Sequence, residues 1–552
     1  MRLNPYLIIT LLALVFYFPL LGKVHLFDWD EINFAEASRE MILTGDYLRV
    51  YIDFQPFWEK PPFFFWLQAL SMKLIGINEY AARLPNAICG LFSLWFIFKI
   101  GKRLYNEHFA WLWTLIYLGS LLPHFYFKSG IIDPWFNLFI FSSLYYFIRF
   151  VWQKDRLVID KSRTNKWAHL VGSGLLAGLA VLTKGPAGLL ILGLCFFVYW
   201  VSKRLKLYIS ISQFLVWLVI FSLLPLTWFG LETLANGPWF VQTFIEYQIR
   251  LFSTPDAGHG GFLGYHFVVL LVGCFPASFF AIRAFLSMPR EEEDYQTDFL
   301  FWMKILFWVV LILFSIVQSK IVHYSSLAYF PLTYLASLSC YKIVRKEIDF
   351  SKWIKVPIII IGGLIATIFL IVPSIARLPD LSTYTDDPFI AGNLEASPHW
   401  SGWETLPGFI LLVVLAMTFY SFRTKINFRT FYGFFLGTAL FISTAILFYV
   451  NRVEAYSQRA AVEFLKSKAD EDCYVIIHGY KSYAHLFYTR KRQPKNKRAS
   501  DTNWLLRGRI DQPVYVITKV HEAEQLKRNK RLNEVGRKNG FVFFKREVPV
   551  SK

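Results

Sequence analysis

The sequence predicts a polytopic α-helical membrane protein, and two observations carry this prediction. The chain has 552 residues, of which 55% are hydrophobic and only 18% are charged. Soluble proteins carry about 25% charged residues. The apolar residues also stand in long blocks, and not in the one-sided stripes of amphipathic helices. A chain with both properties places most of its helices in a lipid bilayer.

About thirteen apolar blocks are long enough to cross a bilayer. They lie near residues 5–22, 83–101, 108–124, 131–151, 167–183, 187–202, 207–230, 263–287, 299–317, 323–343, 356–375, 406–421 and 429–450. One further apolar stretch, residues 61–76, begins with two prolines and contains Gln68 and Lys73. We expect an interfacial or re-entrant helix there.

Lysine and arginine predict the orientation of these spans. The net charge of +19 is concentrated in short connections between alternate blocks and in the segment after Val450. Short loops rich in lysine and arginine stay in the cytoplasm, so we expect a cytoplasmic N-terminus. Topology and anionic lipid headgroups explain the positive charge better than binding of nucleic acid does.

An odd number of spans places four long segments on the outer face. These are the connections 23–82, 231–262 and 376–405 and the tail after Val450. The tail has the pattern of a small α/β domain, with helices expected at 459–469 and 522–529 and strands at 473–480, 513–520 and 540–547. We therefore expect a transmembrane domain over residues 1–450 and an extracytoplasmic α/β domain over 451–552.

The unusual charged residues gather in these outer segments and at the span ends beside them. Ionisable groups at a membrane edge are costly to keep there, which makes them candidates for function. The acidic candidates are Asp30, Glu31 and Asp133. The basic candidates and the histidines near them are Lys60, Arg83, Lys184, Arg250, Lys320, His259 and His323.

This combination of side chains suits transfer of a group from a phosphate carrier. Lysine and arginine form charge-assisted hydrogen bonds with phosphate oxygens. A carboxylate beside them can act as a general base for an acceptor hydroxyl. Nucleotide sugars are not normally available outside the cytoplasm, so a transferase there would use a lipid-linked donor. The sequence requires no cofactor, although Asp30 and Glu31 are able to bind a divalent cation.

Several candidates also have a purely structural explanation. Asp133 precedes Pro134 and could cap a helix. Lys184 could extend from a span end into the interface, and Arg250 could pair with Glu246 four residues earlier. His259 lies among glycines, as a flexible loop residue would, and Asp28 reads as a plain solvated carboxylate.

Five motifs resemble the ArnT/PMT-type membrane glycosyltransferases of the GT-C class. They are, in order, "DWDEINFAEASREMILTGDY", "FWEKPPFFFWLQALSMKLIGINEYAARLPNA", "GIIDP", "LAVLTKGPAGLLIL" and "QSKIVHYSSLAYFPLTYLAS". The order of the motifs, thirteen spans and an outer C-terminal domain all fit this family. The resemblance implies a GT-C-type fold in a bacterial inner membrane. It further implies inverting sugar transfer from a polyprenyl-phosphate carrier, such as undecaprenyl phosphate, at the periplasmic face.

The resemblance also assigns roles to individual residues. Asp30 matches the principal carboxylate of the first loop, Glu31 its neighbour, and Asp133 the second acidic position. Lys60 matches the lysine that approaches the carrier phosphate. Arg250 matches an arginine in a stretch that reads "EYQIR" here, where the family's usual histidine is replaced by Gln248 or Tyr247 depending on register. The segment "GHGGFLGYH" also lacks the family's usual pairing of proline with an aromatic residue.

The acceptor stays open at this point. Relatives modify lipid A, other parts of lipopolysaccharide, or hydroxyls of exported proteins, and a hydroxyl acceptor needs a base where a phosphate does not. Two other functions also stay open. A transporter or flippase of lipid-linked sugars would carry ionisable groups near the membrane midplane and show repeated halves. Alternatively, the tail could be a binding module that the spans only anchor.

Overall fold

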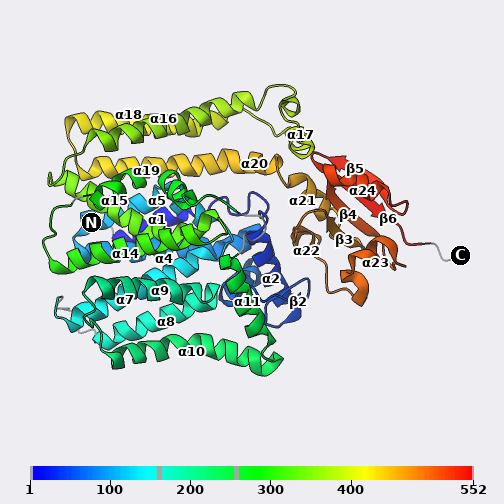
Figure 1. Cartoon of the computed structure of the whole chain (residues 1–552). Coiled ribbons are helices and arrows are strands. Elements are labelled where there is room, and N and C mark those ends of the chain that lie inside the picture. Colours follow the sequence, from blue (N-terminus) through cyan, green and yellow to red (C-terminus); the bar gives the residue numbers. More distant parts are fainter. Residues whose placement is uncertain (1–3, 158–164, 254–259, 287, 550–552) are drawn as a thin grey trace.

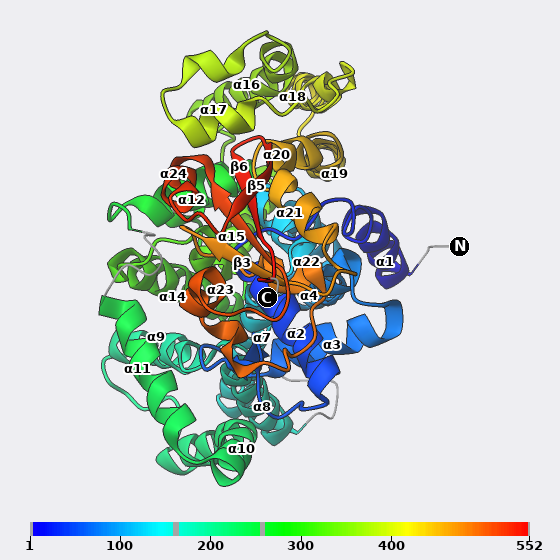
Figure 2. The same cartoon turned by 90° about the vertical axis from the view of Figure 1, so that its right-hand side faces the viewer.

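The computed structural model describes residues 4–157, 165–253, 260–286 and 288–549. Long helices form a bundle, and the C-terminal residues form a separate body at one end of it (Figure 1). Figure 2 looks onto that end and shows the C-terminal body in front of α2 and α7. The functional residues described below lie where the two parts meet.

The bundle contains many helices that are apolar enough to cross a membrane. Within the described residues, seven pass a test of length and composition, or nine if two bent helix pairs each count as one span. The seven are α4 (Glu79–Leu104), α8 (Lys166–Lys184), α10 (Ile211–Asn236), α14 (Asp294–Ile316), α16 (Lys352–Ile375), α18 (Leu406–Thr424) with the turn before it, and α19 (Phe428–Ala445) with the helical turns that follow. The prediction of a multi-span helical membrane protein is therefore confirmed.

The other predicted spans are shorter or bent helices. The bent pairs are α6 (Leu121–Phe125) with α7 (Asp133–Lys154), at 118°, and α12 (Tyr265–Gly273) with α13 (Ala277–Leu286), at 117°. The remaining segments form α1 (Pro5–Phe16), α5 (Glu107–Leu118), α9 (Ala187–Ser202) and α15 (Tyr329–Val344). The stretch expected at 61–76 is α3 (Phe63–Ile75), a short apolar helix.

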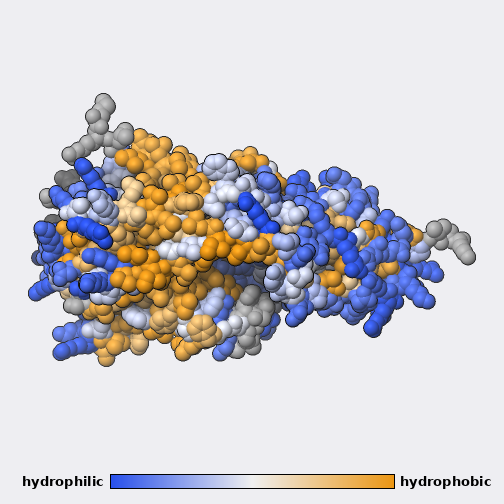
Figure 3. Space-filling model, turned by 90° about the horizontal axis from the view of Figure 1, so that it is seen from above, coloured by the Kyte–Doolittle hydropathy of each residue, from blue (hydrophilic) through white to orange (hydrophobic). Residues whose placement is uncertain are grey.

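The surface of the bundle is apolar where lipid would lie. Figure 3 shows a broad hydrophobic band over the helices and hydrophilic residues at both ends and over the C-terminal body. In α10 and α16 only 22% of the most apolar window is buried, compared with 61% in α4. Exposed apolar side chains would be costly in water, so α10 and α16 form the lipid-facing periphery.

The first outer connection folds into a compact layer at the end of the bundle. Its main element is α2 (Asp30–Thr44), which has two carboxylates in its first turn, where the helix dipole favours negative charge. The helix stops at Gly45, whose φ of 72° is the left-handed conformation that glycine adopts without strain. A short hairpin of two-residue strands follows, made of β1 (Tyr51–Ile52) and β2 (Gln55–Pro56), and then α3.

The C-terminal body is a four-stranded sheet with helices on both faces. The strand order is β3 (Tyr474–His478), β4 (Val514–Lys519), β6 (Phe541–Arg546) and β5 (Asn533–Lys538); β3 is parallel to β4, and the other pairs are antiparallel. On one face pack α21 (Arg459–Lys466) and α22 (Ala484–Thr489). On the other face pack α23 (Thr502–Arg507) and α24 (Ala523–Lys527).

The three expected strands and two expected helices of the tail fall on β3, β4, β6, α21 and α24. The sequence missed β5, α22 and α23. β5 reads "NEVGRK" and is mostly exposed, so it lacks the alternation of apolar and polar residues that marks a half-buried strand. The helices α22 and α23 have six residues each, too few to show a helical period.

Candidate active site

A cavity of about 590 Å³ opens where the first outer connection meets the helix ends. Its walls come from the start of α2, the segment before α3, the start of α7, the end of α8 and the short 3₁₀ helix Val322–Ala328. Of the predicted site residues, Asp30, Glu31, Lys60, Arg83, Asp133, Lys184 and His323 line it. Residues from six separate parts of the sequence thus share one cavity.

His323 connects the two principal carboxylates. Its Nε2 lies 3.3 Å from an Asp30 carboxylate oxygen and 3.7 Å from Asp133 Oδ2. Asp30 is the first residue of α2, and Asp133 is the first residue of α7. The imidazole therefore lies within 4 Å of both carboxylates, between the first residue of α2 and the first residue of α7.

Lys184 pairs with Asp133 on the far side of this arrangement. Its Nζ lies 2.6 Å from Asp133 Oδ1 and 4.9 Å from the centre of the Tyr324 ring. The lysine is the last residue of α8, which ends because Gly185 has a φ of 88°. A side chain at Gly185 would meet the Phe244 ring at 2.7 Å. The sequence "KGP" thus turns the chain tightly and leaves the lysine at the cavity wall.

This geometry corrects the suggestion that Asp133 caps α7. The N-cap residue is Ile132, whose side chain makes no capping hydrogen bond. Pro134 does occupy the first turn of the helix, as the sequence suggested. The Asp133 carboxylate is held by Lys184 and faces His323, so it is available to the cavity.

Asp30 keeps its negative charge at neutral pH. Burial, the largest single influence, would raise the pKa of this carboxyl, but the hydrogen bond and charge of His323 and the charges of Lys60 and Lys184 together outweigh it. The net effect holds the pKa of Asp30 below its ordinary value. An ionised carboxylate can accept a hydrogen bond from a hydroxyl that approaches through the cavity.

Lys60 lies on the other wall, over the face of the Tyr247 ring at 5.1 Å. Burial lowers the pKa of this lysine below its usual range, and Lys184 lowers it further, while Glu59 and Asp30 oppose the shift. Arg250 stacks on the same tyrosine at 5.2 Å. Tyr247 belongs to α11 (Trp239–Ser253), and its hydroxyl donates to Glu59 at 2.9 Å. One aromatic ring therefore holds two cations, of which Lys60 lines the cavity.

Glu31 and Arg83 line the cavity and form an ion pair with each other. The guanidinium donates to both oxygens of the carboxylate, at 2.9 and 2.7 Å, and both residues are buried. Glu31 also accepts from the main-chain N–H groups of Phe27 and Gly130. Arg83 also donates hydrogen bonds to the carbonyls of Leu21, Val24 and His25. These contacts join the start of α2 to α4 and favour a scaffold role over contact with substrate.

Among the predicted site residues that the structure describes, Lys320 and Arg250 do not line the cavity. Lys320 does not line it, because its ammonium donates to carbonyls at the end of α14, including Ser315 and Val317 at 2.6 Å each. The lysine thus caps a helix whose last carbonyls have no partner within the helix. His259 lies outside the described residues.

The predicted pair of metal-binding carboxylates does not converge. Glu31 is held by Arg83, whereas Asp30 faces His323. Within the residues that the structure describes, no group of three or more His, Cys, Asp or Glu side chains has the arrangement of a metal site. Whether the protein needs a divalent cation stays a prediction of the sequence.

The C-terminal body holds the segment that leads into Asp30. The main-chain N–H of Leu26 donates to the Tyr488 hydroxyl at 2.7 Å, and the Leu26 carbonyl accepts from Gln458 at 2.7 Å. Ser482 donates to the Asp28 carboxylate, so Asp28 is not the plain solvated carboxylate that the sequence suggested, and the Trp29 ring packs against Tyr483. The position of Asp30 therefore depends on residues more than four hundred positions away in the sequence.

Among the cavity residues that the sequence did not single out, Glu59, Tyr247 and Tyr324 lie beside the lysines. In the sequence, Tyr247 is one of two residues that could replace the family's histidine, and Glu59 belongs to the motif that begins "FWEKPP". Their role is to position the lysines, and an aromatic residue at a span end is normally read as part of the interfacial belt. Only the contacts with Lys60 and Lys184 distinguish them.

Comparisons with known proteins agree with this fold. Residues 59–228 match the family described as dolichyl-phosphate-mannose-protein mannosyltransferase. A relative from Pectobacterium carotovorum, named undecaprenyl phosphate-alpha-4-amino-4-deoxy-L-arabinose arabinosyl transferase, is 28% identical over 60% of this chain and 58% of its own length. A protein of the same name from Photorhabdus laumondii is 26% identical over 58% of this chain and 57% of its own. The chain thus spans less than two thirds of these relatives.

A solved structure matches almost the whole chain. The crystal structure of ArnT from Cupriavidus metallidurans bound to undecaprenyl phosphate superposes with a TM-score of 0.77 at 19% identity, covering 99% of this chain and 98% of that one. The fold and the charged cavity at the helix ends define a multi-span helical membrane protein of the GT-C type. The sequence matches agree with this fold and show that the chain is similar to ArnT/PMT-type proteins over part of its length.

Proposed function

We propose that this protein is an inverting glycosyltransferase that moves a sugar from a polyprenyl-phosphate carrier to an acceptor of the cell envelope. One observation carries the proposal: a single cavity holds two carboxylates joined by a histidine and, on another wall, a buried lysine. The relatives named above transfer a sugar carried on undecaprenyl phosphate, and the similar ArnT structure binds that carrier. A carrier of this class is the donor we propose here.

The transfer needs one bond to form and one to break. The acceptor oxygen bonds to the anomeric carbon of the sugar, and the bond from that carbon to the carrier phosphate breaks. The leaving phosphate takes the electron pair, and Lys60 and Arg250 stabilise its charge. The acceptor proton goes to Asp30, which is ionised and lies within reach of His323. Attack opposite the leaving group inverts the anomeric centre.

The remaining residues keep these groups in place. Lys184 and Asp133 form an ion pair at 2.6 Å, and the other oxygen of Asp133 lies 3.7 Å from the His323 ring. The ion pair of Glu31 and Arg83 holds the first turn of α2, and the C-terminal body holds the segment before it. Precise placement of reacting groups contributes several kcal/mol to catalysis, on the order of 7–11 in favourable cases.

We also propose the topology expected from the sequence. The chain crosses a bacterial inner membrane thirteen times, with a transmembrane domain over residues 1–450 and a C-terminal domain over 451–552. Both the cavity and the C-terminal domain lie on the periplasmic side. The charged cavity residues stand at helix ends, as Asp133 at the start of α7 and Lys184 at the end of α8 illustrate. That location supports a transferase over a flippase, which would need such groups near the midplane.

The test is turnover of the donor. Purified protein is mixed with a panel of polyprenyl-phosphate sugars and envelope extracts, and release of free polyprenyl phosphate is measured. We expect release for at least one donor, and Asp30→Asn should reduce the rate by about 10²–10⁴-fold because the proton acceptor is lost. Asp294→Asn, an exposed carboxylate at the far end of α14, is the matched control. Undiminished release in Asp30→Asn would overturn the assignment.

A further inference from the structure

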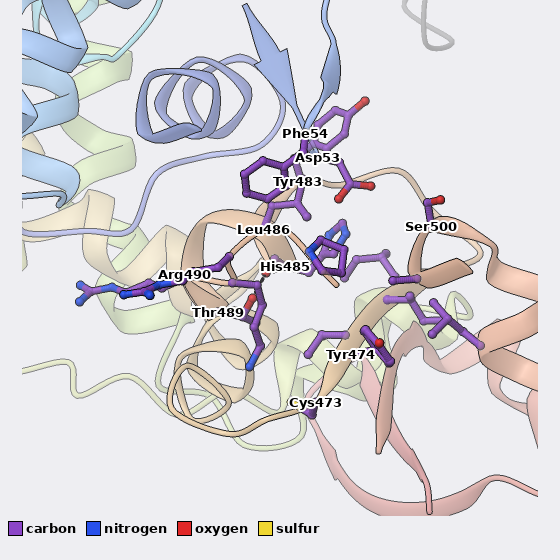
Figure 4. A pocket seen from close by; sticks show the side chains of 18 of the residues that line it. Asp53, Phe54, Cys473, Tyr474, Tyr483, His485, Leu486, Thr489, Arg490 and Ser500 are labelled. Atoms are coloured by element: carbon purple, nitrogen blue, oxygen red, sulfur yellow. Dashed lines mark hydrogen bonds between the residues drawn. The ribbon is translucent and has the colours of Figure 1, made fainter. Parts of the chain in front are cut away.

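A second cavity lies beside the first, between the first outer connection and the C-terminal body. Its volume is about 830 Å³, within the usual range of binding pockets. Trp29 and Glu59 line both cavities, so the two share a wall. Figure 4 shows Asp53, Phe54 and Tyr483 on one side of this second cavity, Tyr474 and Cys473 on another, and His485 between them. We call it the β3 cleft, because every residue from Cys473 to Ile477 lines it.

The cleft runs along an unpaired edge of the sheet. β3 is the outermost strand and pairs only with β4. The Tyr474 N–H donates to the Pro513 carbonyl, so Tyr474 and Ile476 direct their main-chain groups toward β4. In a parallel pair the alternate residues direct theirs away from the partner strand, and here these are Val475 and Ile477. No residue in the described parts of the chain forms a hydrogen bond with their main-chain groups on the open side.

The opposite edge of the same sheet is protected. β5 carries Glu534, Arg537 and Lys538 and has an irregularity in register at Glu534 and Gly536. Charged side chains and bulges are the means by which native edge strands avoid pairing with another chain. β3 has neither feature: its sequence is "YVIIH", and it pairs with β4 in unbroken register. The β5 edge is therefore protected against pairing with a further strand, and the β3 edge is not.

The connection between α22 and α23 leaves space at this edge. The two helices pack on opposite faces of the sheet, so residues 490–501 pass around its β3 side. Several of them, including Arg492 and Ser500, line the cleft opposite β3 instead of pairing with the strand. A protein that needed only to cover this edge could have done so with the same segment.

We infer that the β3 cleft binds an extended polypeptide segment, which adds a strand to the open edge of β3. Main-chain hydrogen bonds to Val475 and Ile477 would supply affinity with little dependence on sequence. Tyr483 and Leu486 lie where side chains on one face of the added strand would project. The segment would lie against the wall that carries Trp29, next to Asp30. If the proposed transferase activity holds, a hydroxyl on such a segment is well placed to become the acceptor.

Binding is tested first, independently of turnover. The probe is a dye-labelled peptide of alternating threonine and valine, titrated with the full-length protein in detergent and followed by fluorescence anisotropy. A peptide methylated on every other amide keeps one edge that can pair and should still bind. A peptide methylated on every amide has no donor left and should bind at least about ten-fold more weakly.

A matched pair of variants tests the edge of the protein. Val475→Pro removes the outward N–H but keeps the β3–β4 ladder, since proline is tolerated where the N–H faces away from the sheet. We expect it to weaken binding about ten-fold, which is 1.4 kcal/mol. Val475→Thr keeps the N–H and should bind as the wild type does. The melting temperature of each variant reports whether the sheet is intact.

Hydrogen exchange on the unaltered protein gives a second measurement. Peptide should slow exchange of the Val475 and Ile477 amides and leave those of Tyr474 and Ile476 unchanged. Equal binding of the fully methylated peptide, or no added protection at Val475 and Ile477, would overturn the inference. Binding of deacylated lipopolysaccharide in place of the peptide would do so as well. Donor release in the earlier assay without peptide binding would refute only this inference, and the reverse result would refute only the proposed transferase.

Discussion

The two cavities share Trp29 and Glu59 but are built on different principles. The cavity at the helix ends is lined by charged side chains that hold one another, such as Asp133 with Lys184 and Glu31 with Arg83. The β3 cleft is lined by an open strand edge and by exposed cations such as Arg492. Fixed charges suit chemistry on one kind of substrate, and a free main chain suits binding of many sequences. The difference predicts that equivalent substitutions will have unequal effects in the two places.

The largest expected difference concerns stability. Arg83→Met leaves Glu31 buried without its partner, and breaking a buried ion pair in this way costs about 3–5 kcal/mol. Arg492→Met, in the β3 cleft, removes an exposed cation and should change the free energy of unfolding by less than about 0.5 kcal/mol. Unfolding in detergent with increasing denaturant measures both. Equal effects would mean that Arg83 is not the scaffold that its contacts indicate.

The next effect is the pH dependence of turnover through Lys60. Burial lowers the pKa of this lysine, so it loses its charge at a lower pH than an ordinary lysine does. Because the charged form stabilises the leaving phosphate, the rate should fall as pH rises through the lowered pKa.

Arginine stays charged throughout this range. Lys60→Arg should therefore move the alkaline decline to higher pH, whatever its absolute rate. Profiles of kcat/KM for the donor measure the shift. An identical alkaline limb in both proteins would show that another group causes it.

The smallest expected effect is at the junction of the two cavities. Ser482→Ala removes one hydrogen bond to Asp28 and loosens the segment before Asp30. A single hydrogen bond contributes about 0.5–1.5 kcal/mol, so we expect kcat to fall by roughly two- to ten-fold with little change in KM for the donor. Ser482→Thr keeps the hydroxyl and should restore kcat. A change in KM alone would place Ser482 in donor binding.

Much of this arrangement could be predicted because it depends on local composition. The apolar blocks, the first outer connection and three of the four C-terminal strands follow from patterns within single segments. The same is true of the acidic and basic candidates, most of which do line one cavity. Long apolar helices and buried strands produce a recognisable pattern of apolar residues in the sequence, because each must bury or expose a whole face.

Other candidates form contacts that the sequence did not predict, and most of these contacts join distant segments. Glu31 and Asp30 are adjacent in sequence, yet Glu31 pairs with Arg83 and Asp30 faces His323. Asp133 and Pro134 looked like a helix cap, but Lys184 takes the carboxylate. Lys320 looked like a ligand for substrate and instead closes the end of α14. A charged residue has no periodicity that reveals its partner, so these outcomes could not be read from the chain.

The sequence alone therefore determined the class of protein, its membrane-spanning character and the set of ionisable residues that gather outside the spans. Tertiary structure decided which of those residues remain available, by pairing some of them permanently and turning others toward a cavity. It also decided that β3 would be the unprotected edge of its sheet, because strand order is set by packing between segments far apart in the chain. Periodic burial is a local property, whereas the pairing of charges and strand edges is not.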